Sequence, residues 1–545
     1  MRKQWVSDLI GESYKKWIKG QMIFIRCHTG GGKSYFLIHT LMMYAIKHDR
    51  TIVIYVSRKT LFDKYQKDII SCALQNGIKL EELDKYVHIY TYQSLITLIN
   101  NGKEPEVADY TCMDEFHYFT SDGDFVAEAE AVYENFVKML PQTVAIGISA
   151  TGERAENKFV KDRGLRLRYS YNEKGMTQHG SDTNKMDVWA YPLVYDVYDL
   201  KADYSYLDVF YLDKQFDVTD VVQFDCENKW LILVPTIKIG RIFYEQLVEK
   251  GISVAFLCSE SMEAEKETVQ SITSMEKFSQ TVLISTQVID TGINLSDYML
   301  KNVILISDIR ESFIQLLGRK RLNDDGERVN LYIPKQTVEH FEYRVASISR
   351  KLDKYAEKIF GKISTTEELM SYFKNTGYDP ELSSLLYFCN GRMKVSNLML
   401  ENLEYQRKEF QTIVKEMYRD EDYFIKLQLS WLGKSKKEFD KSRFVENDLR
   451  EKAMKAFIRI IENVIEKGES YTVDDGKQLV LERLQEYAII VDRDLATKTV
   501  FSVNSFNEFC EKHNLPYICN NEKGKKGFIM YEFMKKKQDE EQPKE

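Results

Sequence analysis

A short apolar strand that runs directly into a glycine-rich turn constrains the fold of this chain more than any other feature. Residues 21–25 read QMIFI, and residues 27–34 read CHTGGGKS. Successive glycines let backbone N–H groups turn inward around an anion, and a helix expected over Tyr35–Ile46 adds the positive end of its dipole. Lys33 is expected to reach the β- and γ-phosphates of a nucleotide, and the Ser34 hydroxyl is expected to ligate Mg²⁺. The predicted nucleotide-binding residues are Thr29, Gly30, Gly31, Gly32, Lys33 and Ser34.

One position of this loop departs from the strict phosphate-loop pattern, because Cys27 stands where that pattern has glycine. The competing interpretation is a mobile glycine turn followed by a chance Lys-Ser pair. A strand before the loop and a helix after it favour the phosphate loop, because its mechanism requires that context.

A second motif, Met113-Asp114-Glu115-Phe116-His117, follows another apolar strand. We expect Asp114 to hold Mg²⁺ through its water shell and Glu115 to orient and deprotonate the attacking water. Phosphoryl transfer depends mainly on positioning and charge stabilisation, so two adjacent acids at a strand end suffice beside the loop. His117 would sense the γ-phosphate from the same turn. Taken alone, the motif would be a solvated strand end, but the loop upstream favours a catalytic role.

Apolar, β-branched runs alternate with helical stretches in two successive series. The strand-like runs are 51–56, 87–90, 110–113 and 143–148, then 230–234, 254–257, 282–284 and 303–306. This alternation predicts parallel sheets covered by helices on both faces. The predicted fold class is α/β, with two tandem parallel-sheet domains followed by a mostly helical C-terminal region. The predicted domains are residues 1–180, residues 181–345, a helical accessory region 346–470, and a small mixed module with a charged tail, 471–545.

The motifs occur in the order typical of superfamily 2 helicases, and residues 1–345 resemble the DEAD/DEAH-box type with a DEFH version of the box. The resemblance implies RecA-like domains with ATP and Mg²⁺ bound between them. Ser149-Ala150-Thr151 is similar to the SAT motif, which implies that Ser149 and Thr151 couple hydrolysis to movement of nucleic acid. Two further segments, 57–61 and 91–95, resemble motifs that contact backbone phosphates, a role that suits hydroxyls, amides and arginine. The implied nucleic-acid-binding residues are Arg58, Thr91 and Gln93.

The second series of strands carries two more motifs of this family. Residues 234–236 (VPT) are similar to motif IV, and residues 285–294 (STQVIDTGIN) are similar to motif V. The resemblance implies that Thr236 and Thr286 contact nucleic acid. It implies that Asp290 and Gly292 belong to the nucleotide-binding site.

Residues 315–321 (QLLGRKR) resemble motif VI, which implies catalytic roles for Gln315, Arg319 and Arg321. The final arginine of that motif usually acts on the γ-phosphate, and its position falls on Leu322 here. Either Arg321 takes this role through a local shift, or Arg319 acts alone. The choice matters, because such an arginine contributes about 10³–10⁵ in rate.

Composition narrows the class of protein. The chain has 545 residues and a formal net charge of -8, which argues against a wholly basic nucleic-acid coat but leaves room for a local basic groove. No C-x-x-C pair occurs among its 8 cysteines, so we expect reduced thiols and no zinc site. No apolar run reaches the roughly 18 residues of a membrane span. We therefore expect a cytoplasmic protein with no membrane partner.

The leading hypothesis is an ATP hydrolase that acts as a helicase or translocase on DNA or RNA, tracking a single strand. The main alternative is an ATP-gated nucleic-acid clamp, or a remodelling subunit of a larger complex, without unwinding activity. Two others are an ATPase that moves proteins and a structural subunit recruited through the helical region, which could also bind a protein partner. A basic cluster after Trp431 either grips a strand or forms a solvated loop, and the second interpretation is favoured. The cluster comprises Lys434, Lys436, Lys437, Lys441 and Arg443.

Overall fold

The computed structural model divides into two compact units, Met1–Val209 with Asp225–Phe439, and Phe210–Phe224 with Asp440–Glu545. The structure describes residues 5–121, 127–179, 194–225, 227–261, 265–287, 294–324, 326–358, 366–377, 383–389, 392–468, 471–492, 495, 501–523 and 529–535. The first unit contains two sheets and a group of helices, and the second contains a small mixed α/β module.

The first sheet has the strand order β3-β2-β4-β5-β1-β8-β6-β7, with β7 antiparallel to β6 and the other paired strands parallel. Strands β1 to β5 alternate with helices, as the sequence predicts. The strands are β1 (Met22–Cys27), β2 (Ile52–Val56), β3 (Val87–Thr91), β4 (Tyr110–Asp114), β5 (Val144–Ser149), β6 (Arg166–Asn172), β7 (Gly175–Gln178) and β8 (Val194–Leu200).

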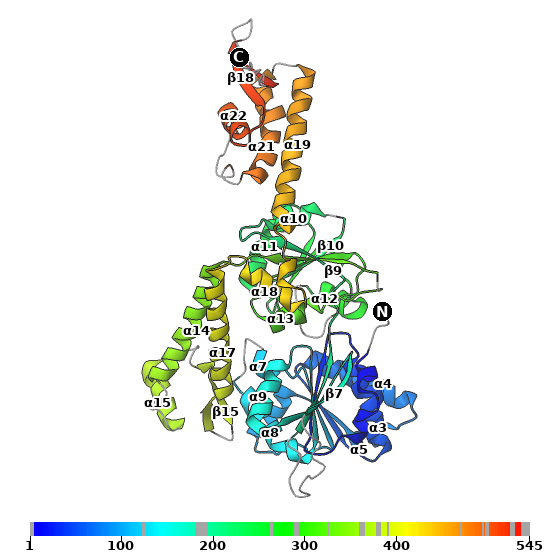
Figure 1. The fold of residues 1–545 in the computed structure, drawn as a ribbon. Coiled ribbons are helices and arrows are strands. Elements are labelled where there is room, and N and C mark those ends of the chain that lie inside the picture. Colours follow the sequence, from blue (N-terminus) through cyan, green and yellow to red (C-terminus); the bar gives the residue numbers. More distant parts are fainter. Residues whose placement is uncertain are drawn as a thin grey trace. The chain divides into compact units, whose positions relative to one another are not determined.

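Helices cover both faces of this sheet, with α8 and α9 on one side and α3 and α4 on the other (Figure 1). Side chains of β1 alternate between the two layers, because neighbours on a strand point to opposite faces. Ile23 and Ile25 join the core on one face, and Met22 and Phe24 join the core on the other. The helices are α3 (Met43–Lys47), α4 (Lys59–Gln75), α5 (Leu80–Tyr86), α6 (Tyr92–Asn100), α7 (Tyr118–Ser121), α8 (Ala129–Met139) and α9 (Glu153–Arg163).

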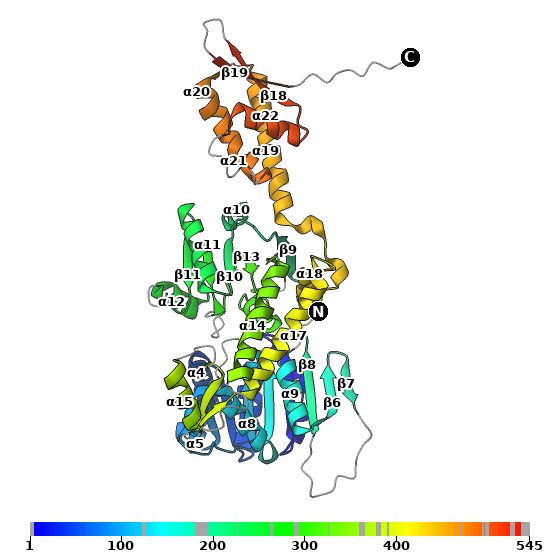
Figure 2. The same cartoon turned by 90° about the vertical axis from the view of Figure 1, so that its left-hand side faces the viewer.

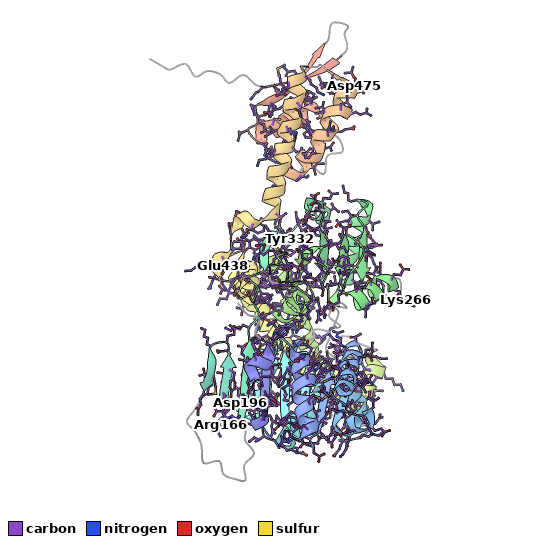
Figure 3. The ribbon with its side chains drawn as sticks, turned by 90° about the vertical axis from the view of Figure 1, so that its right-hand side faces the viewer. Arg166, Asp196, Lys266, Tyr332, Glu438 and Asp475 are labelled. Atoms are coloured by element: carbon purple, nitrogen blue, oxygen red, sulfur yellow. The ribbon has the colours of Figure 1, made fainter. Side chains whose placement is uncertain are left out.

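The chain enters the first sheet through a short helix, and one sequence expectation needs adjustment here. Helix α1 spans Val6–Ile10 and ends at Gly11, which has a positive φ of 53°. A 3₁₀ turn, Ser13–Lys16, follows. The first sheet also continues beyond residue 180, the expected boundary, since β8 pairs with β1. Asp196 of β8 and Arg166 of β6 mark this side of the sheet in Figure 3.

The second sheet has the order β11-β12-β10-β13-β14-β9. Its central strand contains Trp230, which is fully buried and packs on Tyr332 of β14, labelled in Figure 3. The strands are β9 (Leu207–Leu212), β10 (Lys229–Leu233), β11 (Val254–Leu257), β12 (Val282–Ser285), β13 (Leu300–Leu305) and β14 (Val329–Pro334), and the helices between them include α11 (Ile237–Glu249), α12 (Lys266–Met275) and α13 (Arg310–Leu317).

A helical group follows β14 in the first unit, and Figure 2 shows α14 and α17 running side by side. The group consists of α14 (Val338–Lys358), α15 (Thr366–Thr376), the hairpin β15 (Leu386–Cys389) and β16 (Arg392–Val395), α17 (Asn397–Met417) and α18 (Tyr423–Trp431). The predicted fold class, two tandem parallel-sheet domains followed by a mostly helical region, is confirmed.

The second unit is built around the long helix α19, with a three-stranded sheet in the order β17-β19-β18. It starts at Asp440 in this part of the chain, whereas the sequence placed a small mixed module from residue 471. Its main elements are α10 (Val218–Phe224), α19 (Val445–Lys467), β17 (Tyr471–Thr472), α21 (Glu482–Val491), α22 (Val503–Lys512), β18 (Tyr517–Lys523) and β19 (Ile529–Lys535). Within the described ranges of the whole chain, no helix combines the length and apolarity that crossing a membrane requires.

Candidate nucleotide site

The phosphate loop leaves β1 and enters a helix at Lys33, as predicted. Gly30 and Gly32 have φ angles of 86° and 88°, in the left-handed region that favours glycine. The Lys33 ammonium donates to the carbonyl of Cys27 over 3.2 Å, which holds it inside the turn. A Cβ at Gly31 would lie 2.3 Å from Sγ of Cys27. The Cys27 side chain therefore occupies the space that any side chain at position 31 would need, and only glycine fits there.

The two acids of the second motif lie at the end of β4, beside the loop. Oε1 of Glu115 is 4.0 Å from Nζ of Lys33. Glu115 has a positive φ of 51°, an uncommon backbone conformation for a residue with a side chain. Its backbone N–H donates to Oδ1 of Asp114 over 3.0 Å. The Asp114 carboxylate therefore stabilises the sharp turn that follows the strand.

Two buried tyrosines that sequence reasoning missed fix Asp114 in place. The hydroxyl of Tyr65 donates to Oδ2 of Asp114 over 2.9 Å, and the hydroxyl of Tyr92 donates to the Asp114 carbonyl over 2.8 Å. Burial raises the pKa of Asp114, and the negative charge of Glu115 raises it further. Tyr65 lies in α4 and Tyr92 begins α6, and nothing in their local sequence patterns links either residue to residue 114.

Tyr65 also lies near Ser34, the other residue expected to hold Mg²⁺. Burial and the charge of Asp114 raise the pKa of the Tyr65 phenol, and the Ser34 hydroxyl opposes this rise. Ser34 and Asp114 therefore both lie close to one phenol. Mg²⁺ prefers oxygen ligands and usually keeps several waters together with substrate phosphates. An oxygen pair beside a phosphate loop fits that preference.

A chain of polar contacts leads from Glu115 to the SAT motif. Nδ1 of His117 lies 2.9 Å from Oγ of Ser149 and 3.3 Å from Oε2 of Glu115. Oγ of Ser149 accepts a hydrogen bond from the backbone N–H of Thr151 over 3.0 Å. His117 thus bridges the expected base and the expected coupling residues.

The second α/β domain reaches the same group of residues through Gln315 of α13. Its Nε2 lies 3.4 Å from Oε2 of Glu115 and 3.4 Å from Oγ1 of Thr151. Oε1 of Gln315 is buried without a hydrogen-bond partner among the described residues. The Gln315 side chain therefore places a hydrogen-bonded Nε2 and an Oε1 without such a partner next to Glu115.

Electrostatics keep Glu115 ionised. Burial by itself would raise the pKa of its carboxyl, but the positive charge of Lys33 and the hydrogen bond from His117 outweigh that effect. Arg319 adds a further favourable charge. The pKa of Glu115 therefore lies below its ordinary value, and the carboxylate carries its charge at neutral pH.

The segment after α13 turns two arginines toward the site. Lys320 forms an isolated bridge with Leu295, because Leu295 donates to the carbonyl of Arg319 and Arg321 donates to the carbonyl of Leu295, each over 2.8 Å. Between the two arginines, the buried Lys320 forms an ion pair with Glu327 at 2.8 Å.

Arg321 reaches the phosphate loop of the first domain. A Cβ at Gly30 would lie 2.7 Å from Nη1 of Arg321, so the guanidinium lies directly against the loop. Gly318 makes a similar approach, since a Cβ there would lie 2.6 Å from Oγ1 of Thr29. Leu322, by contrast, is 38% exposed. Arg321 therefore lies beside the phosphate loop, and its role as the final arginine of motif VI stays a prediction.

Part of motif V lies outside the described residues, including Asp290 and Gly292. Thr286, which follows β12, is buried, and its N–H donates to the carbonyl of Leu257 over 3.1 Å. The roles implied for these residues stay predictions.

The other residues implied to bind nucleic acid lie where strands end and helices begin. Arg58 precedes α4, and Thr91 caps α6 by accepting a hydrogen bond from the N–H of Ser94. Thr236 caps α11 in the same way, and Gln93 is exposed in the first turn of α6. The carboxyl ends of parallel strands meet at one edge of each sheet, which is the usual position for ligand contacts.

The aromatic residue before the basic cluster has packing partners. Trp431 lies 5.4 Å from the ring of Phe313 and 5.8 Å from that of Phe424, measured between centroids. Lys436 lies over the ring of Tyr423. These contacts agree with the favoured interpretation of the cluster as a helix-flanking loop.

Fold and site together define a nucleotide-binding P-loop protein whose helicase-type motifs are divided between two tandem α/β domains. Residues 3–154 match the protein family described as type III restriction enzyme, res subunit. That segment carries the phosphate loop, the Asp114–Glu115 pair and the SAT motif. The resemblance to superfamily 2 helicases is confirmed, and this part of the chain is a helicase-superfamily domain. A search of the curated proteins found no match.

Two solved structures show how distant the similar folds are. S. cerevisiae Dbp5 bound to RNA and ADP BeF3 shares 15% identity, covering 63% of this chain and 84% of that chain, with a TM-score of 0.39. Mss116p (NTE and C-tail double deletion) bound to ssRNA and AMP-PNP shares 13% identity, covering 79% and 86%, with a TM-score of 0.44. Likeness at this level identifies no activity for the present chain.

Proposed function

We propose that this chain is an ATP-dependent helicase or translocase that couples ATP hydrolysis to movement along nucleic acid. The observation that carries the proposal is the position of Gln315. This residue of the second domain contacts both Glu115, the expected base, and Thr151 of the SAT motif, in the first domain. A hydrolysis site completed by both domains gives ATP turnover a direct route to domain movement.

The roles of the residues follow from their positions. Bound Mg²⁺·ATP would supply the γ-phosphoryl group and neutralise its charge, held by Ser34, Asp114 and the phosphate loop. Glu115, ionised at neutral pH, accepts the proton of the attacking water. Gln315 has a buried oxygen available to orient that water. The His117 ring contacts both Glu115 and Ser149 and so fixes the position of one side chain relative to the other.

Arg321 is the candidate arginine finger, and Arg319 strengthens the positive field around Glu115. Because Arg321 lies against Gly30, the absence of arginine at position 322 does not favour a clamp over a motor. A strand-displacement assay separates the two functions, since a clamp would hydrolyse ATP without displacing a strand.

Nucleic acid is proposed to contact the helix starts after β3 and β10. The oxygens of Thr91 and Thr236 accept hydrogen bonds from their helices, which leaves each hydroxyl hydrogen for a phosphate. Such contacts are sequence-neutral, and binding should weaken steeply with salt. The matched family is described as a restriction-enzyme subunit, so DNA belongs in the test beside RNA.

The decisive experiment measures ATPase activity alone and with single- and double-stranded DNA and RNA. We expect stimulation by at least one polymer. Lys33→Ala should abolish nucleotide binding, whereas Glu115→Gln should bind ATP without turning it over. Absence of stimulation by every polymer would contradict the proposal, and a wild-type rate in Glu115→Gln would contradict the assigned base.

A further inference from the structure

Helix α17 contacts the first domain at the segments that follow the acidic motif, residues 113–117, and the SAT motif, residues 149–151. Nδ2 of Asn402 donates to the carbonyl of Phe119, two residues after His117, over 3.2 Å. Oδ1 of Asn402 accepts from Arg154, three residues after Thr151, over 2.5 Å. One side chain of α17 therefore contacts the segments that follow both the acidic motif and the SAT motif.

Arg154 makes this junction specific. Its other terminal nitrogen donates to the carbonyl of Thr120 over 2.9 Å, and its guanidinium lies 3.9 Å from the ring centroid of Tyr405 on α17. The guanidinium is planar, its N–H groups are hydrogen-bonded and its face lies over an aromatic ring, so it is held in one orientation. Leu398, one turn earlier on α17, lies in the same apolar core as Phe119, so this end of the helix cannot slide freely.

The next helix is anchored on the second domain. Nε2 of Gln428 in α18 donates to the carbonyl of Ser307 over 3.2 Å, and Trp431 packs on Phe313 of α13. Asp422, just before α18, forms an ion pair with Lys335 at 2.7 Å. Helix α13 is the element that carries Gln315.

The connection between these anchors is stiff. Helix α17 has 21 residues and packs along α14, which follows β14 of the second domain. Phe341 of α14 contacts Phe410 of α17 and Phe424 of α18. Packed cores shift between discrete arrangements and do not deform continuously. A displacement at Asn402 would thus reach α13 through packed side chains.

We propose that α17 and α18 form a strap that couples the acidic and SAT motifs to α13, and that Asn402 and Arg154 are its positioning residues. The strap regulates the site described above, and so this inference rests on the proposed function. Its task is to link the nucleotide state of the first domain to the placement of Gln315 and Arg321. Neither Asn402 nor Arg154 contacts the nucleotide site itself.

The test compares Asn402→Ala with Asn402→Asp and with Lys408→Ala, an exposed position on the same helix. Asn402→Ala should leave polymer-free ATPase within about two-fold of wild type and lower the polymer-stimulated kcat at least ten-fold. Asn402→Asp keeps the acceptor for Arg154 and should recover most of the stimulation. Lys408→Ala should match wild type. Thermal unfolding of each variant identifies any that fails to fold.

Domain movement is measured independently of any polymer. Cysteines introduced at the exposed Glu81 and Lys250 carry a fluorophore pair, with Cys226 replaced by serine; the described native cysteines are buried. AMP-PNP should change the energy transfer in wild type and in Asn402→Asp, but much less in Asn402→Ala.

These two measurements separate the two proposals. If no polymer stimulates the wild type but AMP-PNP still moves its domains in an Asn402-dependent way, the motor proposal fails and the strap stands. If Asn402→Ala equals wild type in both measurements, the strap is overturned. A wild type without any AMP-PNP response also overturns the strap, because it leaves no movement to transmit.

Discussion

The guanidinium of Arg321 lies so close to the backbone of Gly30 that a single added Cβ would come within 2.7 Å of Nη1. Gly30 belongs to the phosphate loop of the first α/β domain, and Arg321 belongs to motif VI of the second. Their contact places the guanidinium beside the phosphate loop, where we propose that it acts on the γ-phosphate of bound ATP.

Replacing this arginine tests the one-residue shift in motif VI. Arg321→Ala should lower the polymer-stimulated kcat by about 10³-fold, near the lower end of the range known for arginine fingers. Leu322→Ala changes the position where the family has its arginine, and it should have little effect because that side chain is exposed. Steady-state ATPase assays check both, and a larger loss in Leu322→Ala than in Arg321→Ala would reverse the assignment.

A methyl group at Gly318 should act on the approach of the two domains. Gly318 has an ordinary helical φ of -65°, so alanine brings no backbone strain. Its Cβ would lie 2.6 Å from Oγ1 of Thr29, and that clash must push the segments apart. We expect Gly318→Ala to lower kcat at least ten-fold.

The matched double variant Thr29→Gly/Gly318→Ala removes the obstructing side chain. It should be more active than Gly318→Ala, although Thr29→Gly alone is expected to weaken the phosphate loop. Kinetics of the four proteins give the coupling between the two positions. Strictly additive effects would mean that the predicted clash does not form.

Tyr65→Phe should weaken Mg²⁺ binding while leaving the core intact. The substitution keeps the buried ring and removes only the hydroxyl that donates to Asp114, a residue expected to hold Mg²⁺. Loss of such an outer partner typically lowers metal affinity about 10- to 100-fold. Mg²⁺ titrations of nucleotide binding measure this effect. Tyr35→Phe, an exposed tyrosine next to Ser34, serves as the control and should leave the Mg²⁺ dependence unchanged.

Glu327→Gln should destabilise the second domain in a pH-dependent way. Burial alone would raise the pKa of Glu327, but the N–H of Asn323 and the charge of Lys320 overcome this and lower it to about 2. A depressed carboxyl pKa stabilises the fold above the unfolded value, near 4.5, and this contribution is lost as the pH falls toward 2.

The expected loss at neutral pH is about 1.5–3 kcal/mol, the usual range for a hydrogen bond to a charged group. Denaturant unfolding at several pH values checks the prediction. The difference between Glu327→Gln and wild type should be full at pH 7 and should shrink below about pH 4.5. A difference that does not depend on pH would show that the ion pair is not its source.

The fold class could be predicted from the sequence, and so could several of the residues that meet at the candidate site. Apolar runs and their spacing predict the strands β1 to β5, because burial on both faces of a parallel sheet leaves a recognisable pattern. The phosphate loop and the acidic motif are each local, so their positions at strand ends could be predicted. The resemblance to superfamily 2 helicases rests on the same local motifs.

Tertiary structure alone decided which distant side chains meet. Tyr65 and Tyr92 reach Asp114 from helices whose periodicity reports only that they are buried. Arg321 reaches Gly30 of the other α/β domain from a backbone that pairs with Leu295, and no local pattern specifies that contact. Asn402 joins two motifs through contacts more than 240 residues apart in sequence. Local patterns encode the face of an element, but the partner across that face depends on how the elements pack.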